Sequence, residues 1–129
     1  MPKIAGLFIT GTDTGVGKTF IGAGLARALY HKGVKVQPRK PVESGCPTLG
    51  GQRVPADGMA YHAAVNGAIP LEVITPYRYS AALAPPQAAQ REGQTLTLDQ
   101  LQHAVLDGTE AEDFLLVEGA GGFYSPIAM

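Results

Sequence analysis

Short apolar runs alternate along the chain with amphipathic stretches. The runs at residues 3–10 and 113–118 are each followed by glycine, and a third run at residues 34–37 is interrupted by Pro38. Apolar runs of this length, without alternating polar positions, are typical of strands that are covered on both faces. We therefore predict buried strands at these places and a further short strand over residues 72–77.

The amphipathic stretches predict four helices. Residues 19–32 and 57–66 each carry apolar side chains at helical spacing, and each stretch is followed by glycine, which is typical of a C-cap. A third helix is expected to begin at residues 84–86, where proline suits a first turn, and a fourth at the capping-box sequence of residues 97–100. The polar segment at residues 46–55 is predicted to be a loop.

This order of elements predicts an α/β fold with a parallel sheet and helices on both faces. At 129 residues the chain is expected to form a single domain. In such sheets ligands bind at the carboxyl ends of the strands. Candidate functional segments follow three of the predicted strands, after Thr10, Gln37 and Val117.

Composition excludes several classes of protein. Ten Lys and Arg against eleven Asp and Glu leave a net charge of -1, which argues against nucleic-acid binding through a general basic field. No apolar run approaches the roughly 18–20 residues of a membrane span, and no signal peptide is evident. Cys46 is the only cysteine and fits a reducing, cytoplasmic compartment. We expect small-molecule partners, without nucleic acid or membrane.

A glycine-rich segment between the first strand and the first helix predicts phosphate binding. It reads Gly11-Thr12-Asp13-Thr14-Gly15-Val16-Gly17-Lys18-Thr19. Backbone N–H groups around its glycines can surround an anion at a helix N-terminus. Lys18 can neutralise phosphate oxygens, and the Thr19 hydroxyl can ligate Mg²⁺. The spacing between Gly11 and Gly17 is one residue longer than in the usual phosphate loop. The alternative is therefore a glycine-rich turn with an incidental lysine. Gly-Lys-Thr at a strand-to-helix junction nevertheless favours a phosphate loop.

Charged residues follow the other strands. Lys40 begins the segment Lys-Pro-Val-Glu-Ser-Gly, in which Ser44 adds a hydroxyl. Its place after a predicted strand favours a role in ligand binding, and the alternative is a surface loop with a solvated lysine. Asp57 either caps its helix, ligates a metal, or does both. Glu118 ends the last strand, where phosphate-loop enzymes place a carboxylate near Mg²⁺, although a charge at a strand end needs no such role.

Taken together, these segments resemble the dethiobiotin synthetase family of biotin synthesis. The resemblance rests on residues 11–19, residues 40–45, Asp57, and Val-Glu-Gly-Ala-Gly-Gly at 117–122, with the family's spacing along the chain. It implies a phosphate-loop NTPase type of fold that lacks its C-terminal part here. Residues 1–129 would form the N-terminal portion of a longer domain, and the full-length protein would be a homodimer.

The resemblance also implies an activity, which is the ATP- and Mg²⁺-dependent conversion of 7,8-diaminononanoate and CO₂ to dethiobiotin. The route would pass through a carbamate and a carbamic-phosphoric anhydride. Because a carbamate and a triphosphate repel each other, cations are needed between them. The implied catalytic residues are Lys40, Lys18 and Thr14. The implied nucleotide-binding residues are Asp13, Thr14, Gly15, Val16, Gly17, Lys18, Thr19, Glu118, Gly119 and Gly121. The implied substrate-binding residues are Thr14, Lys40, Ser44, Gly121 and Gly122, and the implied metal ligands are Thr19, Asp57 and Glu118.

Two alternative functions remain at this point. A switch-type ATPase of the partition and cell-division group would typically carry a second lysine early in the loop, where Thr12 stands, and would gain little from the segment at residues 40–45. The other alternative is a nucleotide-binding fragment without activity.

Overall fold

The computed structural model describes residues 4–10 and 16–120, with Val16 described by its helical backbone only. Several predicted site residues lie outside the described residues, and these are Asp13, Thr14, Gly15, Gly121 and Gly122.

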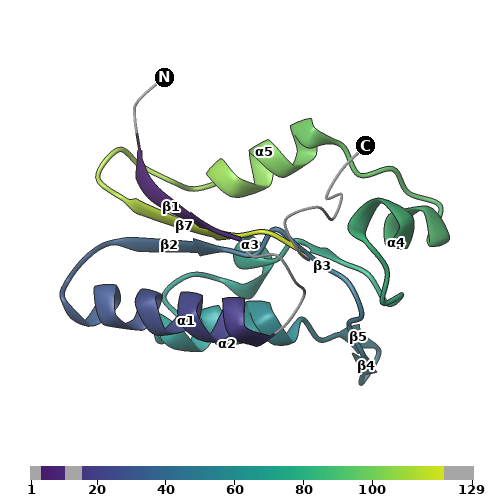
Figure 1. Ribbon diagram of the computed structural model, residues 1–129, viewed down its shortest axis with the longest axis horizontal. Coiled ribbons are helices and arrows are strands. Elements are labelled where there is room, and N and C mark those ends of the chain that lie inside the picture. Colours follow the sequence, from purple (N-terminus) through teal and green to yellow (C-terminus); the bar gives the residue numbers. More distant parts are fainter. Residues whose placement is uncertain (1–3, 11–15, 121–129) are drawn as a thin grey trace.

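Three parallel strands form the central sheet, as predicted. They are β1 (Ala5–Ile9), β2 (Val36–Arg39) and β7 (Phe114–Glu118), and β7 lies between the other two (Figure 1). The predicted bounds of β2 were wrong, because the strand includes Pro38 instead of ending before it. Among the described strands β2 lies at an edge of the sheet, where a proline without a backbone N–H is tolerated.

Helices cover both faces of this sheet, also as predicted. Helix α1 (Val16–His31) and helix α2 (Ala56–Ala64) lie on one face, and helix α5 (Leu98–Leu106) lies on the other (Figure 1). The first face holds a core cluster of Ala26, Val36, Tyr61, Ala64, Val65, Ile74 and Leu116. The capping box of α5 is confirmed, because Thr97 accepts the backbone N–H of Gln100 and the Gln100 side chain accepts that of Thr97.

The chain between β2 and β7 also contains short elements. Strand β3 (Val42–Glu43) pairs in parallel with β6 (Tyr77–Arg78), and helix α4 (Pro85–Arg91) begins with proline as expected. The segment predicted to be a loop contains a small hairpin of β4 (Thr48–Leu49) and β5 (Gln52–Arg53). The hairpin turns through two glycines, both at positive φ, a conformation that other residues rarely adopt.

The predicted strand over residues 72–77 was wrong over most of its length. Helix α3 (Leu71–Ile74) occupies its first half, directly after Pro70, and only Tyr77 belongs to a strand. Pro70 fits the start of a helix because its fixed φ suits that place and no backbone N–H is needed there. A run of a few apolar residues does not show whether its period is helical or extended.

Strand β1 lies at the other edge of the described sheet. Leu7 is 44% exposed and Phe8 is 58% exposed, so this edge presents apolar side chains to solvent. Within the described parts of the chain, no helix combines the length and the apolar character needed to cross a membrane.

Candidate functional site

Lys40 lies at the carboxyl end of β2, and its ammonium group contacts two carboxylates. Its Nζ lies 2.8 Å from Asp57 Oδ2 and 2.7 Å from Glu118 Oε2. Lys40 is only 5% exposed and Glu118 only 1% exposed. The alternative of a solvated lysine in a surface loop is therefore wrong. We call Lys40, Asp57 and Glu118, together with Thr19 and Tyr61, the Lys40 cluster.

The charge of Lys40 is set by opposing effects. Burial alone lowers the pKa of its ammonium group, but the charges and hydrogen bonds of Glu118 and Asp57 raise the pKa above the ordinary value of 10.5. Lys40 is therefore a cation at neutral pH. Two of its three N–H donors are used by carboxylates of the described residues, which leaves one for a further anion.

Helix α1 brings two residues of the predicted phosphate loop to the same place. The Lys18 Nζ lies 3.4 Å from the carbonyl oxygen of Gly119, and the Thr19 hydroxyl lies 3.0 Å from each carboxylate oxygen of Glu118. Burial lowers the pKa of Lys18, and the positive charge of Lys40 lowers it further, against the opposite effect of Glu118. The two ammonium groups thus lie on the same side of the molecule, where β2 and β7 end.

The expected role of Asp57 as the N-cap of α2 was wrong. The helix begins at Ala56, and its first N–H groups are accepted by a residue distant in sequence. Glu43 Oε2 accepts the N–H of Asp57 and Glu43 Oε1 accepts that of Gly58, both at 3.1 Å. Because Glu43 caps the helix, the Asp57 carboxylate is available to Lys40. Sequence reasoning missed this role of Glu43.

Tyr61 is a second residue that sequence reasoning missed. Its side chain is fully buried, and its hydroxyl donates a hydrogen bond to Glu118 Oε1 at 2.7 Å. Burial and the contact with Glu118 raise the pKa of the Tyr61 hydroxyl far above its ordinary value of 10, so it remains a donor. The available signal was its position four residues after Asp57, which places both on one face of a helix.

The remaining described candidates are Ser44, Gly17 and Gly119. Ser44 follows β3, and its buried hydroxyl has no hydrogen-bond partner among the described residues. Gly17 lies in the first turn of α1 and is exposed. Gly119 follows β7, and a Cβ at this position would lie 3.2 Å from the ring of Phe8. A larger residue at position 119 would therefore crowd β1.

The oxygen atoms of Thr19, Asp57 and Glu118 form a donor set of the kind that Mg²⁺ prefers. Magnesium in proteins is commonly held by one or two carboxylates, with waters and substrate phosphates in the other positions. Over residues 4–10 and 16–120, no three acidic, histidine or cysteine side chains gather into a complete metal cage. The residues present fit an ion that is bound together with a nucleotide.

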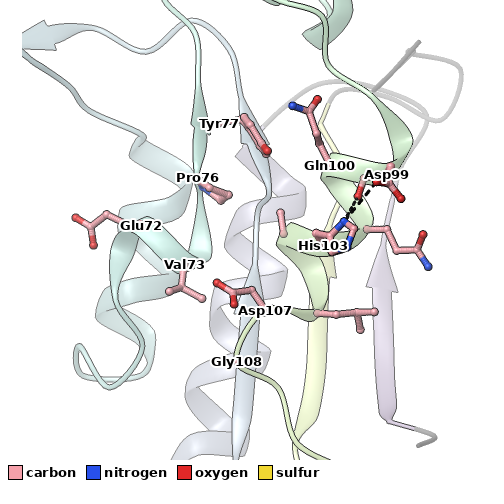
Figure 2. Close-up of a pocket in the computed structure, with 12 residues that line it drawn as sticks. Glu72, Val73, Pro76, Tyr77, Asp99, Gln100, His103, Asp107 and Gly108 are labelled. Carbon is pink, nitrogen blue, oxygen red and sulfur yellow. Dashed lines mark hydrogen bonds and ion pairs between the residues drawn. The ribbon is translucent and has the colours of Figure 1, made fainter. Parts of the chain in front are cut away.

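Two grooves of the described residues are alternative candidate sites. One, of about 810 Å³, lies between α3–β6 and α5 and includes Glu72, His103 and Asp107, with His103 turned toward Asp99 (Figure 2). It contains none of the predicted site residues. The other, of about 480 Å³, is mainly apolar and is bordered by Glu118 and Gly119, so it opens beside the Lys40 cluster.

Comparison with known proteins places this chain in a family. A family model described as AAA domain, AAA_26, matches residues 5–129. A protein of Anaeromyxobacter sp. (strain Fw109-5) named ATP-dependent dethiobiotin synthetase BioD is 44% identical over 126 residues, which cover 95% of this chain and 53% of that protein. Proteins of the same name from Ruthia magnifica subsp. Calyptogena magnifica and Aquifex aeolicus (strain VF5) are 40% and 43% identical, and the matches cover 95% and 94% of this chain and 55% and 52% of those proteins.

These matches confirm the resemblance to dethiobiotin synthetases, and the chain spans about half the length of the curated relatives it matches. The family model covers nearly the whole chain. The chain belongs to the AAA_26 family of AAA domains.

Proposed function

We propose that the complete protein is an ATP-dependent dethiobiotin synthetase, which forms dethiobiotin from 7,8-diaminononanoate, CO₂ and ATP. The observation that carries the proposal is the meeting of Lys18 and Lys40 at Glu118 and Gly119. The names of the similar proteins support the same activity. The proposal includes a homodimeric, cytoplasmic enzyme whose partners are small molecules, with residues 1–129 as the N-terminal portion of a longer phosphate-loop domain.

The proposed reaction brings two anions together. CO₂ forms a C–N bond with one amine of the diamine, which loses a proton and becomes a carbamate. The carbamate oxygen then attacks the γ-phosphorus of ATP, and the bond to ADP breaks. The second amine attacks the carbamoyl carbon, the C–O bond to phosphate breaks, and the amine proton is released as the ring closes.

The residues of the chain suit this sequence of steps. Lys18 would hold the phosphates, together with Asp13, Thr14, Gly15, Val16 and Gly17 of the loop. Lys40 would use its remaining donor on the carbamate and the transferred phosphoryl group, because both carry negative charge close to it. The buried hydroxyl of Ser44, which has no described partner, would bind substrate, along with Thr14, Gly121 and Gly122.

Thr19, Asp57 and Glu118 would hold a magnesium ion. The ion, when bound, would neutralise charge on the phosphates of ATP. Thr19 and Glu118 are already joined by hydrogen bonds, and Lys40 joins Glu118 to Asp57. The chain thus holds these oxygen donors close together, which lowers the entropic cost of arranging them around an ion.

The proposal is tested by measuring ADP formation by the complete protein with ATP, Mg²⁺ and bicarbonate, with and without the diamine. We expect turnover to require both the diamine and bicarbonate, and dethiobiotin to appear in proportion to ADP. Equal ADP formation without the diamine would support a switch-type ATPase instead. ATP binding without any turnover would support an inactive nucleotide-binding protein.

A further inference from the structure

Tyr61 and Gly22 form a matched pair next to the carboxylate of Glu118. Tyr61 projects from α2, and Gly22 lies on α1, which packs against α2. A Cβ at position 22 would overlap the hydroxyl oxygen of Tyr61. The hydroxyl therefore occupies space that exists because residue 22 has no side chain, and from that space it reaches Glu118 Oε1.

Three side chains together hold the Glu118 carboxylate in one orientation. Tyr61 donates to Oε1 and Lys40 donates to Oε2, at 2.7 Å each, and the Thr19 hydroxyl lies between the two oxygens. Rotation of the carboxylate about its last bond would remove the acceptor from a fully buried phenol. Buried donors without acceptors are strongly disfavoured, so the orientation is well determined.

We propose that Tyr61 is a positioning residue, which orients Glu118 for the divalent cation of the nucleotide site and for which Gly22 provides the space. The inference rests on the proposed function for the presence of that cation. Tyr61 does not touch the substrate; it acts through Glu118. Hydrogen-bond partners of metal-binding side chains commonly change metal affinity by about 10- to 100-fold when they are removed.

The first test measures metal binding without turnover. Mn²⁺ binding to the complete protein is followed by electron paramagnetic resonance in the presence of ADP, for the wild type, Tyr61→Phe and Tyr30→Phe. Tyr30 is a matched control, because it lies in the last turn of α1 and packs against the same core cluster.

We expect Tyr61→Phe to weaken Mn²⁺ binding by about tenfold and Tyr30→Phe to leave it unchanged. Equal affinities of the wild type and Tyr61→Phe would overturn the inference, and so would a wild type that binds no Mn²⁺ with ADP. Neither of these Mn²⁺-binding measurements requires the diamine. A protein whose ADP formation is independent of the diamine but whose Mn²⁺ affinity falls in Tyr61→Phe would disprove the proposed function and support this inference.

The second test measures the pairing itself through thermal stability. Gly22→Ala is made alone and in the Tyr61→Phe background. With the hydroxyl removed, the nearest atoms to the new methyl group are Ile9 Cδ1 at 2.9 Å and the ring carbon Cζ at 3.0 Å, of which the isoleucine end can move. We expect Gly22→Ala to lower the unfolding temperature more in the wild type than in the Tyr61→Phe background. Equal decreases in the two backgrounds would overturn the pairing.

Discussion

Lys40 contributes to the stability of the fold as well as to the proposed chemistry. It places one buried positive charge between the carboxylates of Asp57 and Glu118, which come from different elements. Without it, two negative charges would face each other in a largely buried site. Breaking a buried ion pair by removing one partner usually destabilises a protein by about 3–5 kcal/mol.

The substitution Lys40→Ala is expected to abolish diamine-dependent turnover while ATP binding persists. It should also lower the free energy of unfolding by about 3 kcal/mol, at the low end of the range because Asp57 is 34% exposed. ADP release measures turnover, a nucleotide-binding assay measures ATP binding, and chemical denaturation measures the free energy of unfolding.

Lys35→Ala is the control for this variant, because Lys35 forms an exposed ion pair with Glu112. Its effect on stability should be below about 1 kcal/mol. A Lys40→Ala protein that loses ATP binding but keeps its residual rate would contradict the role proposed for Lys40.

Helix α2 depends on a cap supplied by β3. Both oxygens of Glu43 accept N–H groups of the first turn, and the carboxylate is also favoured by the positive end of the helix dipole. Through this cap, Glu43 fixes the start of the helix that carries Asp57 and Tyr61. The Lys40 cluster therefore depends on Glu43, which is not one of its members.

Removal of this cap by Glu43→Ala is expected to destabilise the protein by about 1–2 kcal/mol at neutral pH. Burial raises the pKa of Glu43 above 4.5, although the N–H groups of α2 lower it in part. The folded state thus binds a proton before the unfolded state as the pH falls. As the pH falls from the raised pKa of Glu43 to 4.5, proton uptake therefore stabilises the folded wild type. The Glu43→Ala variant lacks this carboxyl group, so its stability does not increase in the same way.

The difference in unfolding free energy between wild type and Glu43→Ala should therefore be larger at pH 5 than at pH 8. Urea denaturation at both values measures it, with the exposed Glu72→Ala as control. A difference that is smaller at pH 5 than at pH 8 would show that Glu43 is more easily ionised in the folded state.

Elements with local signals were predictable from the sequence, and elements fixed by distant contacts were not. The capping box of α5 and the glycine after α1 lie within one turn of the ends they mark. The cap of α2 comes from Glu43, 14 residues before Asp57, so the adjacent sequence pointed to Asp57 instead. In the same way, topology predicted that Lys18, Lys40 and Glu118 meet at strand ends, but it could not show the contact of Tyr61 with Glu118.

At the scale of the whole molecule, β1 presents an apolar edge. Leu7 and Phe8 are exposed, and no described strand pairs with the outer side of β1. The relatives are about twice as long as the chain. An unpaired strand edge with apolar side chains favours pairing with another chain.

Residues 1–129 produced alone are therefore expected to self-associate with increasing concentration, and Phe8→Thr should reduce this while retaining a residue that suits a strand. Sedimentation velocity measures the association. Leu49→Thr is the control, since Leu49 is 64% exposed but lies in the β4–β5 hairpin. If both substitutions reduced self-association equally, or if the protein were a monomer at all concentrations, the β1 edge would not be the site of self-association.

The central position of β7 has a consequence for synthesis on the ribosome. The two outer strands bond to β7, and the contact between Thr19 and Glu118 spans 99 positions of the chain. At about 5–20 residues per second, an emerging chain holds β1 without its neighbour for on the order of ten seconds. During that interval β1, and β2 once it is made, lack the strand that joins them, and unpaired strand edges with apolar surface favour aggregation of the nascent chain.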